Sequence, residues 1–195
     1  EIHERLVGSE MCIRDSEYPA LEADIPVITS EGKSNVKIAG VKSKNKLVRY
    51  TIPETLLRAD ENFLALMVEA EKYIGYPYVY GGSKPSTGFD CSGFVCWVFR
   101  QSGVYDTGRL GAKGLYSLCT DVSRDEARPG DLVFFTKTMG ADVKGITHVG
   151  IYVGNNMMLH AGDPVGFADL QSDKWAKKIY AFGRLPVQQG AQANE

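Results

Sequence analysis

The first half of the chain shows apolar residues at helical spacing. In the run ENFLALMVEAEKYIG, six apolar side chains recur every three or four positions, and this predicts a helix over 61–74 that stops at Gly75. A second pattern of this kind predicts a helix from about 91 to 102, with Asp90 as its N-cap. A short helix is predicted over 112–119.

The pattern changes to that of β-strands after residue 128. The runs that carry this signal are DLVFF, THVGIYVG, MMLHA and KIYAFGRL. DLVFF is apolar throughout, which is typical of a strand covered on both faces, whereas THVGIYVG alternates. A hairpin turn at 154–156 is expected to join the second and third runs. Helices followed by antiparallel strands predict an α+β domain, with the N-terminal helices packed on a central antiparallel sheet.

The domain boundaries follow from shifts in composition. Residues 1–16 fit no amphipathic period, and their run VGSEMCIRDS resembles translated sequencing-adapter sequence, so we expect a non-native leader. The polar, lysine-rich stretch 17–60 is interpreted as a linker or small arm. The folded domain is predicted over 61–186, and 187–195 as a disordered tail.

Composition excludes several classes of function. Lysine and arginine number 22 against 24 aspartates and glutamates, which argues against a nucleic-acid groove. No apolar run approaches the roughly 20 residues that cross a bilayer, and the N-terminus lacks the layout of a signal peptide. Any export signal must therefore lie outside this chain.

The four cysteines do not form a metal or disulfide pattern. They show no CxxC spacing and no nearby histidine pair, so neither a zinc site nor any other metal site is expected, and no cofactor is implied. Cys96 and Cys119 lie in apolar runs, which favours buried structural side chains. Only Cys91 has polar neighbours.

Cys91 lies in the sequence GFDCSGF, at the start of the second predicted helix. Unpaired backbone N–H groups give a helix N-terminus partial positive charge, which favours the thiolate form of a cysteine there. Asp90 would cap the helix, and the small residues Ser92 and Gly93 would let a substrate approach the sulfur.

Two histidines could assist this cysteine. If 154–156 form a three-residue loop, Gly150 faces His160, and His148 and His160 share one face within side-chain reach. A two-residue loop would place the rings on opposite faces, so catalysis requires the longer loop or a bulge. Taken singly, each histidine and the cysteine are more often structural. Their joint placement favours catalysis, with His148 as base to Cys91 and His160 orienting the His148 ring.

The motifs YPYVYGG, GFDCSGFVCWVFRQSG, RPGDLVFF and THVGIYVGNNMMLHA, in this order, resemble those of the NlpC/P60 family of bacterial cell-wall cysteine peptidases. The resemblance covers about 61–185 and implies a papain-like fold. It implies Cys91 as nucleophile, His148 as base and His160 as third polar residue. Tyr78, Asp90 and Ser92 would line the pocket that in many members binds the free amine of an N-terminal L-alanine.

The resemblance also implies an activity. Family members typically cut peptidoglycan stem peptides between γ-D-glutamate and the following diamino acid, so we expect a secreted, monomeric thiol peptidase at the bacterial cell wall. Two alternatives remain open at this stage. One is a catalytically silent wall-binding module with the same cleft, and the other is a papain-like amidase or acyltransferase acting on another amide or ester.

Overall fold

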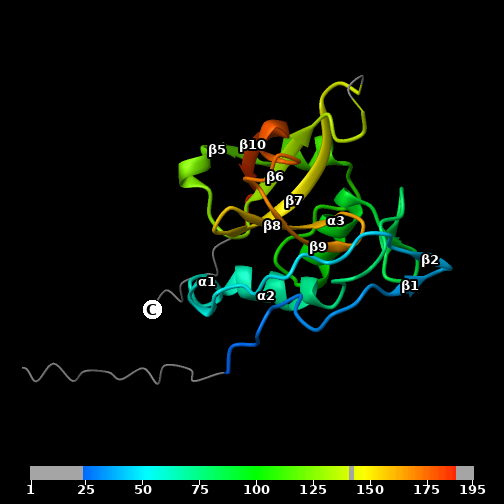
Figure 1. Ribbon diagram of the computed structural model, residues 1–195. Helices are drawn as coiled ribbons and strands as arrows, with labels where there is room; N and C mark the ends of the chain where they lie inside the picture. Colours follow the sequence, from blue (N-terminus) through cyan, green and yellow to red (C-terminus); the bar gives the residue numbers. More distant parts are fainter. Residues whose placement is uncertain (1–23, 141–142, 188–195) are drawn as a thin grey trace, which may run out of the picture.

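The computed structural model describes residues 24–140 and 143–187. The leader expected at 1–16, with Cys12 in it, lies outside the described residues. Of the tail expected over 187–195, only Val187 is described, and it packs against the core. A layer of helices lies along one side of an antiparallel sheet (Figure 1). This is the predicted α+β arrangement.

The two long helices begin at side chains that cap them. Asp60 and Asp90 accept backbone N–H bonds from Phe63 and Gly93, and so start the two long helices. The predicted helix over 61–74 ends earlier than expected, and the chain then turns through Gly75 at a φ of 95°. The helical elements are α1 (Glu54–Arg58), α2 (Glu61–Glu71), α3 (Cys91–Gln101), α4 (Ala112–Leu118), and the short 3-10 turns η1 (Arg124–Glu126) and η2 (Ala176–Lys178).

The main sheet has six strands in the order β5-β10-β6-β7-β8-β9, all paired antiparallel. Its strands are β5 (Thr120–Val122), β6 (Leu132–Thr136), β7 (Ile146–Gly154), β8 (Met157–Ala161), β9 (Val165–Asp169) and β10 (Ile179–Arg184). Two further pairs of two-residue strands are β1 (Lys37–Ile38) with β2 (Val41–Lys42), and β3 (Ser83–Lys84) with β4 (Gly88–Phe89).

Strand β6 is covered on both faces, as its apolar run predicts. Leu132 and Phe134 belong to the large core beneath the helices. Val133 and Phe135 belong to a smaller cluster on the opposite face, together with Trp175. All five side chains are buried, so the sheet separates two apolar layers of unequal size.

The β7–β8 hairpin differs from its expected form. Asn155 and Asn156 have φ values of 51° and 57° and form a two-residue turn between Gly154 and Met157, so the expected three-residue loop is wrong. A bulge after Tyr152 supplies the missing residue and shifts the register. The catalytic interpretation required a longer loop or a bulge, and the bulge meets that requirement.

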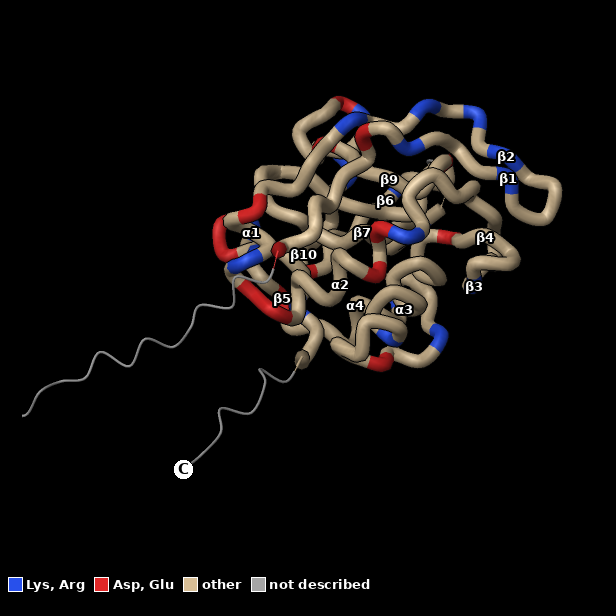
Figure 2. Tube along the Cα trace, turned by 90° about the horizontal axis from the view of Figure 1, so that it is seen from below, with Lys and Arg blue, Asp and Glu red and all other residues tan. Residues whose placement is uncertain are grey.

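The arm over 24–53 packs against the domain. Ile28 and Ile52 are buried in the core beneath the helices, and backbone hydrogen bonds join the chain around these two residues. Figure 2 shows Lys and Arg gathered along the stretch that carries β1 and β2. Most of these cations are exposed. Of the apolar residues of the arm, Ile28 and Ile52 are buried, whereas Val27, Val41 and Val48 are exposed.

Strand β9 was not predicted. Its sequence VGFAD follows Gly-Asp-Pro and precedes a polar segment, so local signals indicate a loop. All five residues nevertheless pair with β8, which forms the strand through a long-range contact. Within the described residues, no helix is long and apolar enough to span a membrane.

Candidate functional site

The N-terminus of α3 holds Cys91 where the sequence predicts it. Asp90 has extended backbone, and its Oδ1 accepts a hydrogen bond of 2.6 Å from the Gly93 N–H. This cap fixes the start of the helix and leaves Cys91 as its first residue. The Cys91 side chain is buried, with 8% of the residue exposed.

Asp90 is also the centre of a polar cluster. Its Oδ1 accepts from the Ser92 hydroxyl at 3.1 Å, and its Oδ2 accepts from the Gly81 N–H at 3.1 Å. Arg109 donates to Asp90 Oδ2 at 2.8 Å and to Ser92 Oγ at 3.0 Å. Sequence reasoning missed Arg109 because it lies between glycines in a loop without periodicity.

At Cys91, burial affects the pKa of the thiol more than the helix N-terminus does. Loss of solvation raises the pKa of its thiol above the ordinary value, and the Asp90 carboxylate adds to that rise. The backbone N–H groups of Val149, Ser92 and Cys91 act in the opposite direction and only partly compensate. The sequence-based expectation of a thiolate at rest is therefore not met, because desolvation is the larger effect.

His148 and His160 form a hydrogen-bonded pair. The distance from His148 Nε2 to His160 Nδ1 is 2.8 Å, and their ring planes are nearly perpendicular. Burial lowers the pKa of His148 to about 3, with a smaller contribution from Lys174. Burial also lowers the pKa of His160. Both imidazoles are therefore neutral at physiological pH.

Trp175 covers this pair and was not predicted. Its indole stacks on His148 with ring centroids 5.1 Å apart and meets His160 edge-on at 5.0 Å. The Lys174 ammonium lies 5.2 Å from the indole centroid. The run QSDKWAKK is polar and predicts an exposed segment. The one sequence signal for this packing is the large aromatic residue within the run.

The cysteine and the histidines line adjoining hollows of one cleft. One hollow is lined by Cys91 and Arg109, among others, and the next by His148 and His160. The residues common to both are Tyr78, Tyr80, Met139 and Thr147. Tyr80 is 79% exposed and Met139 51% exposed, so apolar side chains form the rim where a ligand would enter.

Cys91 Sγ lies near the strand that carries His148, its expected base, but the two side chains are not hydrogen-bonded in the described residues. Cys91 Sγ lies by the backbone N–H of Val149, the residue after His148. Among the described residues, no hydrogen bond joins Cys91 Sγ to the His148 ring. Hydrogen bonds of catalytic pairs are often long in ligand-free enzymes and tighten when substrate binds.

Tyr78 lies between the two hollows. It forms an isolated parallel bridge with Phe89, which places it beside the start of α3. Burial, together with Cys91 and Asp90, raises the pKa of the Tyr78 hydroxyl to about 12. The phenol therefore stays protonated and is available as a hydrogen-bond donor.

Gly93 has a different role from the one expected. A Cβ at this position would lie 2.1 Å from the Gly82 carbonyl oxygen and 3.0 Å from Asp90 Oδ1. The space beside Gly93 is thus filled by the loop before α3 and not left for a substrate. The absence of a side chain lets this loop pack against the helix.

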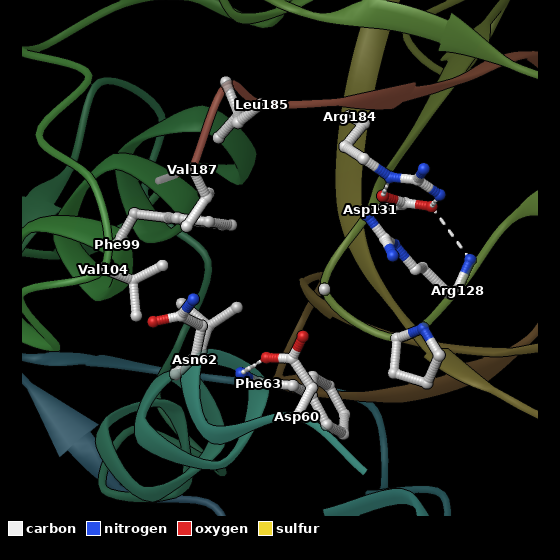
Figure 3. Close-up of a pocket in the computed structure, with 13 residues that line it drawn as sticks. Asp60, Asn62, Phe63, Phe99, Val104, Arg128, Asp131, Arg184, Leu185 and Val187 are labelled. Carbon is white, nitrogen blue, oxygen red and sulfur yellow. Dashed lines mark hydrogen bonds and ion pairs between the residues drawn. The ribbon is translucent and has the colours of Figure 1, made fainter. Parts of the chain in front are cut away.

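A separate pocket lies away from this cleft. Figure 3 shows it between the start of α2 and the end of β10, and none of the expected site residues lines it. Arg184 donates to both oxygens of buried Asp131, at 2.7 and 2.9 Å, while Asp60 caps α2. Asp60, Asp131 and Arg184 thus have hydrogen-bond partners within the fold, which indicates a structural role for these three side chains. In the described part of the chain, no cluster of three or more His, Cys, Asp or Glu could hold a metal ion.

The comparisons with known proteins agree with this fold. A profile of the NlpC/P60 family matches residues 75–184. The chain belongs to the NlpC/P60 family, and its fold is the papain-like fold of these domains.

Two relatives have names that describe an endopeptidase and a hydrolase. The chain is 46% identical over 121 residues to the bifunctional muramidase/DL-endopeptidase CwlT of Bacillus subtilis, a match that covers 62% of this chain and 36% of that protein. It is 41% identical over 120 residues to the gamma-DL-glutamyl hydrolase of the same organism, covering 60% of this chain and 28% of that protein. The chain therefore spans about a third of the length of these relatives.

A solved structure is similar as well. A protein from Staphylococcus aureus, described as similar to a lipoprotein of the NLP/P60 family, matches with a TM-score of 0.61 and 41% identity. The match covers 67% of this chain and 43% of that one.

Proposed function

We propose that this domain is a cysteine endopeptidase that cuts peptidoglycan stem peptides between γ-D-glutamate and the following diamino acid. The observation that carries the proposal is one cleft that brings Cys91, at the start of α3, next to the hydrogen-bonded His148–His160 pair. The names of the relatives, a DL-endopeptidase and a gamma-DL-glutamyl hydrolase, support this choice of bond.

The histidine pair supports distinct roles for the two rings. When His148 donates its Nε2–H to His160 Nδ1, its own Nδ1 carries a lone pair. That lone pair can accept the thiol proton of Cys91. His160 acts as a positioning residue, because its hydrogen bond holds the His148 tautomer and ring orientation.

The reaction starts from a neutral thiol and a neutral imidazole. His148 Nδ1 removes the Cys91 proton as the sulfur attacks the γ-carbonyl carbon, and a tetrahedral oxyanion forms. The intermediate collapses, the C–N bond breaks, and His148 gives the proton to the leaving amine. Water, deprotonated by His148, then attacks the thioester and releases the γ-D-glutamyl product and the free Cys91 thiol.

The oxyanion needs hydrogen-bond donors beside the sulfur. The Cys91 backbone N–H, at the first position of α3, is a suitable donor because it precedes the intrahelical hydrogen bonds. The protonated Tyr78 hydroxyl, which lines both hollows, is a second donor.

The substrate implies the place of action. Stem peptides occur in the bacterial cell wall, so the domain would work outside the cytoplasm. No metal or cofactor takes part in these steps.

Digestion of purified muropeptides tests the proposal. The 195-residue chain and its Cys91→Ala variant are incubated with stem peptides that contain diaminopimelate or lysine, and the products are identified by mass spectrometry. We expect water to be added between γ-D-glutamate and the diamino acid with the wild type only. Water added at a different bond would favour the amidase alternative, and binding without cleavage would favour a wall-binding module.

A further inference from the structure

A third hollow continues the cleft beyond the histidine pair. Of the residues described, none lines both this hollow and the hollow of Cys91. The arm segment 45–48 lines it, outside the residues that the family profile matches. The residues that it shares with the hollow of the histidine pair are His160, Gly162, Asp163, Lys174 and Trp175. The cleft therefore runs from Cys91, past the histidines, to the arm.

The proposed mechanism places the leaving half of the substrate beside the histidine pair. His148 gives its proton to the amine of the diamino acid, so this amine lies against the His148 ring when the C–N bond breaks. The γ-D-glutamyl half stays on the Cys91 sulfur as the thioester. The diamino acid therefore lies in the hollow of the histidine pair, with the third hollow next to it.

Lys174 places a positive charge in this part of the cleft. Its ammonium lies 5.2 Å from the indole centroid of Trp175, the ring that stacks on His148. Lys174 is exposed and lines both the hollow of the histidine pair and the third hollow. Among the described residues, no carboxylate forms an ion pair with it. A ligand in either hollow therefore meets a cation whose charge is not already paired.

Asp163 places a negative charge in the same two hollows. Within the part of the chain that the structure describes, its carboxylate accepts one hydrogen bond, from the Lys44 backbone N–H at 3.4 Å. Lys46 and Asp169 add one charge of each sign to the third hollow. Since Asp163 and Lys174 do not pair with each other, they suit a ligand group that carries both an ammonium and a carboxylate.

Meso-diaminopimelate ends in such a group, and L-lysine does not. The far carbon of meso-diaminopimelate carries an ammonium and a carboxylate, whereas the L-lysine side chain ends in an ammonium alone. Three methylenes lie between the two amino-acid carbons, so the far carboxylate is about 7 Å from the leaving nitrogen in an extended chain. Lys174 lies across one indole ring from His148, which is a comparable reach.

A carboxylate bound at Lys174 would also assist the base. Burial lowers the pKa of His148, and the charge of Lys174 lowers it further, because it opposes a second positive charge on the ring. His148 must carry that charge when it takes the Cys91 proton. A carboxylate on Lys174 offsets the opposing charge, so the matching diamino acid favours the protonated ring at the step that needs it.

We propose that Lys174 binds the side-chain carboxylate of meso-diaminopimelate in the leaving half of the substrate, while Asp163 faces the ammonium of the same group. The enzyme therefore prefers meso-diaminopimelate over L-lysine. This inference rests on the proposed function. It assigns the choice of wall peptide to a residue of the polar segment before η2, outside the catalytic pair.

The test compares three tripeptides that begin with L-Ala-γ-D-Glu and differ in the third residue. These residues are meso-diaminopimelate, meso-diaminopimelate with its side-chain carboxylate converted to a carboxamide, and L-lysine. All three keep the same α-carboxylate. We measure kcat/KM with the wild type, Lys174→Gln, Lys174→Arg and Lys177→Gln. Lys177 is the matched control, since it is an exposed lysine of η2 and lines neither hollow.

An ion pair to an exposed lysine is weaker than a buried one, so we expect a roughly five- to tenfold preference for the carboxylate peptide over each of the others. The wild type, Lys174→Arg, which keeps the charge, and Lys177→Gln should show this preference. Lys174→Gln should lower the ratio of carboxylate to carboxamide to about one.

A merely structural role for Lys174 would reduce the cleavage of all three peptides equally and leave the ratio unchanged. An unchanged ratio in Lys174→Gln would overturn the inference and leave the proposed activity intact. Equal cleavage by the wild type of the carboxylate peptide and either of the others would do the same.

If the wild type cleaves none of the peptides, the proposed function fails, and calorimetry with the uncleaved peptides decides the inference. Binding of the carboxylate peptide should then exceed that of the carboxamide by the same ratio in the wild type but not in Lys174→Gln. Equal binding of the two peptides by the wild type, or binding of neither, would refute the inference.

Discussion

The indole of Trp175 stacks on the imidazole of His148, with ring centroids 5.1 Å apart and planes inclined by 26°. Trp175 is the N-cap residue of η2, between β9 and β10, and its ring also meets His160 edge-on, so it covers the hydrogen-bonded pair. It keeps water away from the ring that acts as base in our proposal. Loss of this cover should therefore be visible in the pH dependence of activity.

Trp175→Ala should raise the lower pH limit of activity. His148 must be neutral to act as base, and burial lowers its pKa to about 3, so wild-type activity should persist as pH falls below 6.5. Without the indole, the pKa of His148 should return toward 6.5, and activity should be lost at that higher pH. The profile of kcat/KM against pH measures the shift. Trp175→Phe, which keeps an aromatic cover, should shift less, and an unchanged acid limb in Trp175→Ala would contradict this account.

His160→Asn should retain more activity than His160→Leu. The Asn side-chain oxygen lies at about the position of His Nδ1 and can still accept the His148 Nε2–H, whereas leucine leaves that donor buried without a partner. We expect a loss of kcat of roughly tenfold for Asn and roughly 100-fold or more for Leu. Melting curves check that both variants fold. Equal losses would mean that His160 only packs.

Alkylation of Cys91 should respond to pH as a buried neutral thiol does. Burial raises the pKa of the Cys91 thiol, so the thiolate should form only at a higher pH than in an exposed cysteine. The rate of reaction with iodoacetamide should rise through that higher range of pH, and peptide mass spectrometry separates Cys91 from the other cysteines. A rate that is already constant between about pH 5 and 8 would instead indicate a thiolate–imidazolium pair at rest.

Asp131→Asn should destabilise the fold without changing the site. Asp131 is 3% exposed and its side chain binds Arg184 through both oxygens, but Arg184 is one-third exposed, which reduces the expected cost to about 2 kcal/mol. Urea unfolding measures the loss, and kcat per folded molecule should not change, since this pair lies outside the cleft (Figure 3). The exposed Asp106, changed to Asn, is the control and should leave the unfolding midpoint in place. A loss of kcat in Asp131→Asn would show that the two regions are coupled.

The sequence predicts the parts of the site that depend on local signals. The cap at Asp90 and the apolar period after it define α3 and the place of Cys91. The alternation of β7, with a bulge in its hairpin, brings His148 and His160 to one face. Each signal lies within a few residues of the structure that it produces.

The remaining parts depend on contacts between distant segments. Arg109 reaches Asp90 across 19 positions from a glycine-containing loop, and Trp175 reaches His148 from a polar turn. Strand β9 forms by pairing its backbone with that of β8. The expected tendency of Cys91 toward the thiolate also depended on distant contacts. The burial that raises its pKa comes from packing and cannot be predicted from its neighbours in the sequence.

Trapping of the acyl-enzyme tests the central claim most directly. The wild-type chain is mixed with a stem peptide, quenched with acid within one turnover, and analysed by intact-protein and peptide mass spectrometry. We predict the mass of the γ-D-glutamyl fragment added as a thioester on Cys91, with no such addition in Cys91→Ala. Cleavage of the peptide by Cys91→Ala, or an acyl group on any other residue, would contradict the account.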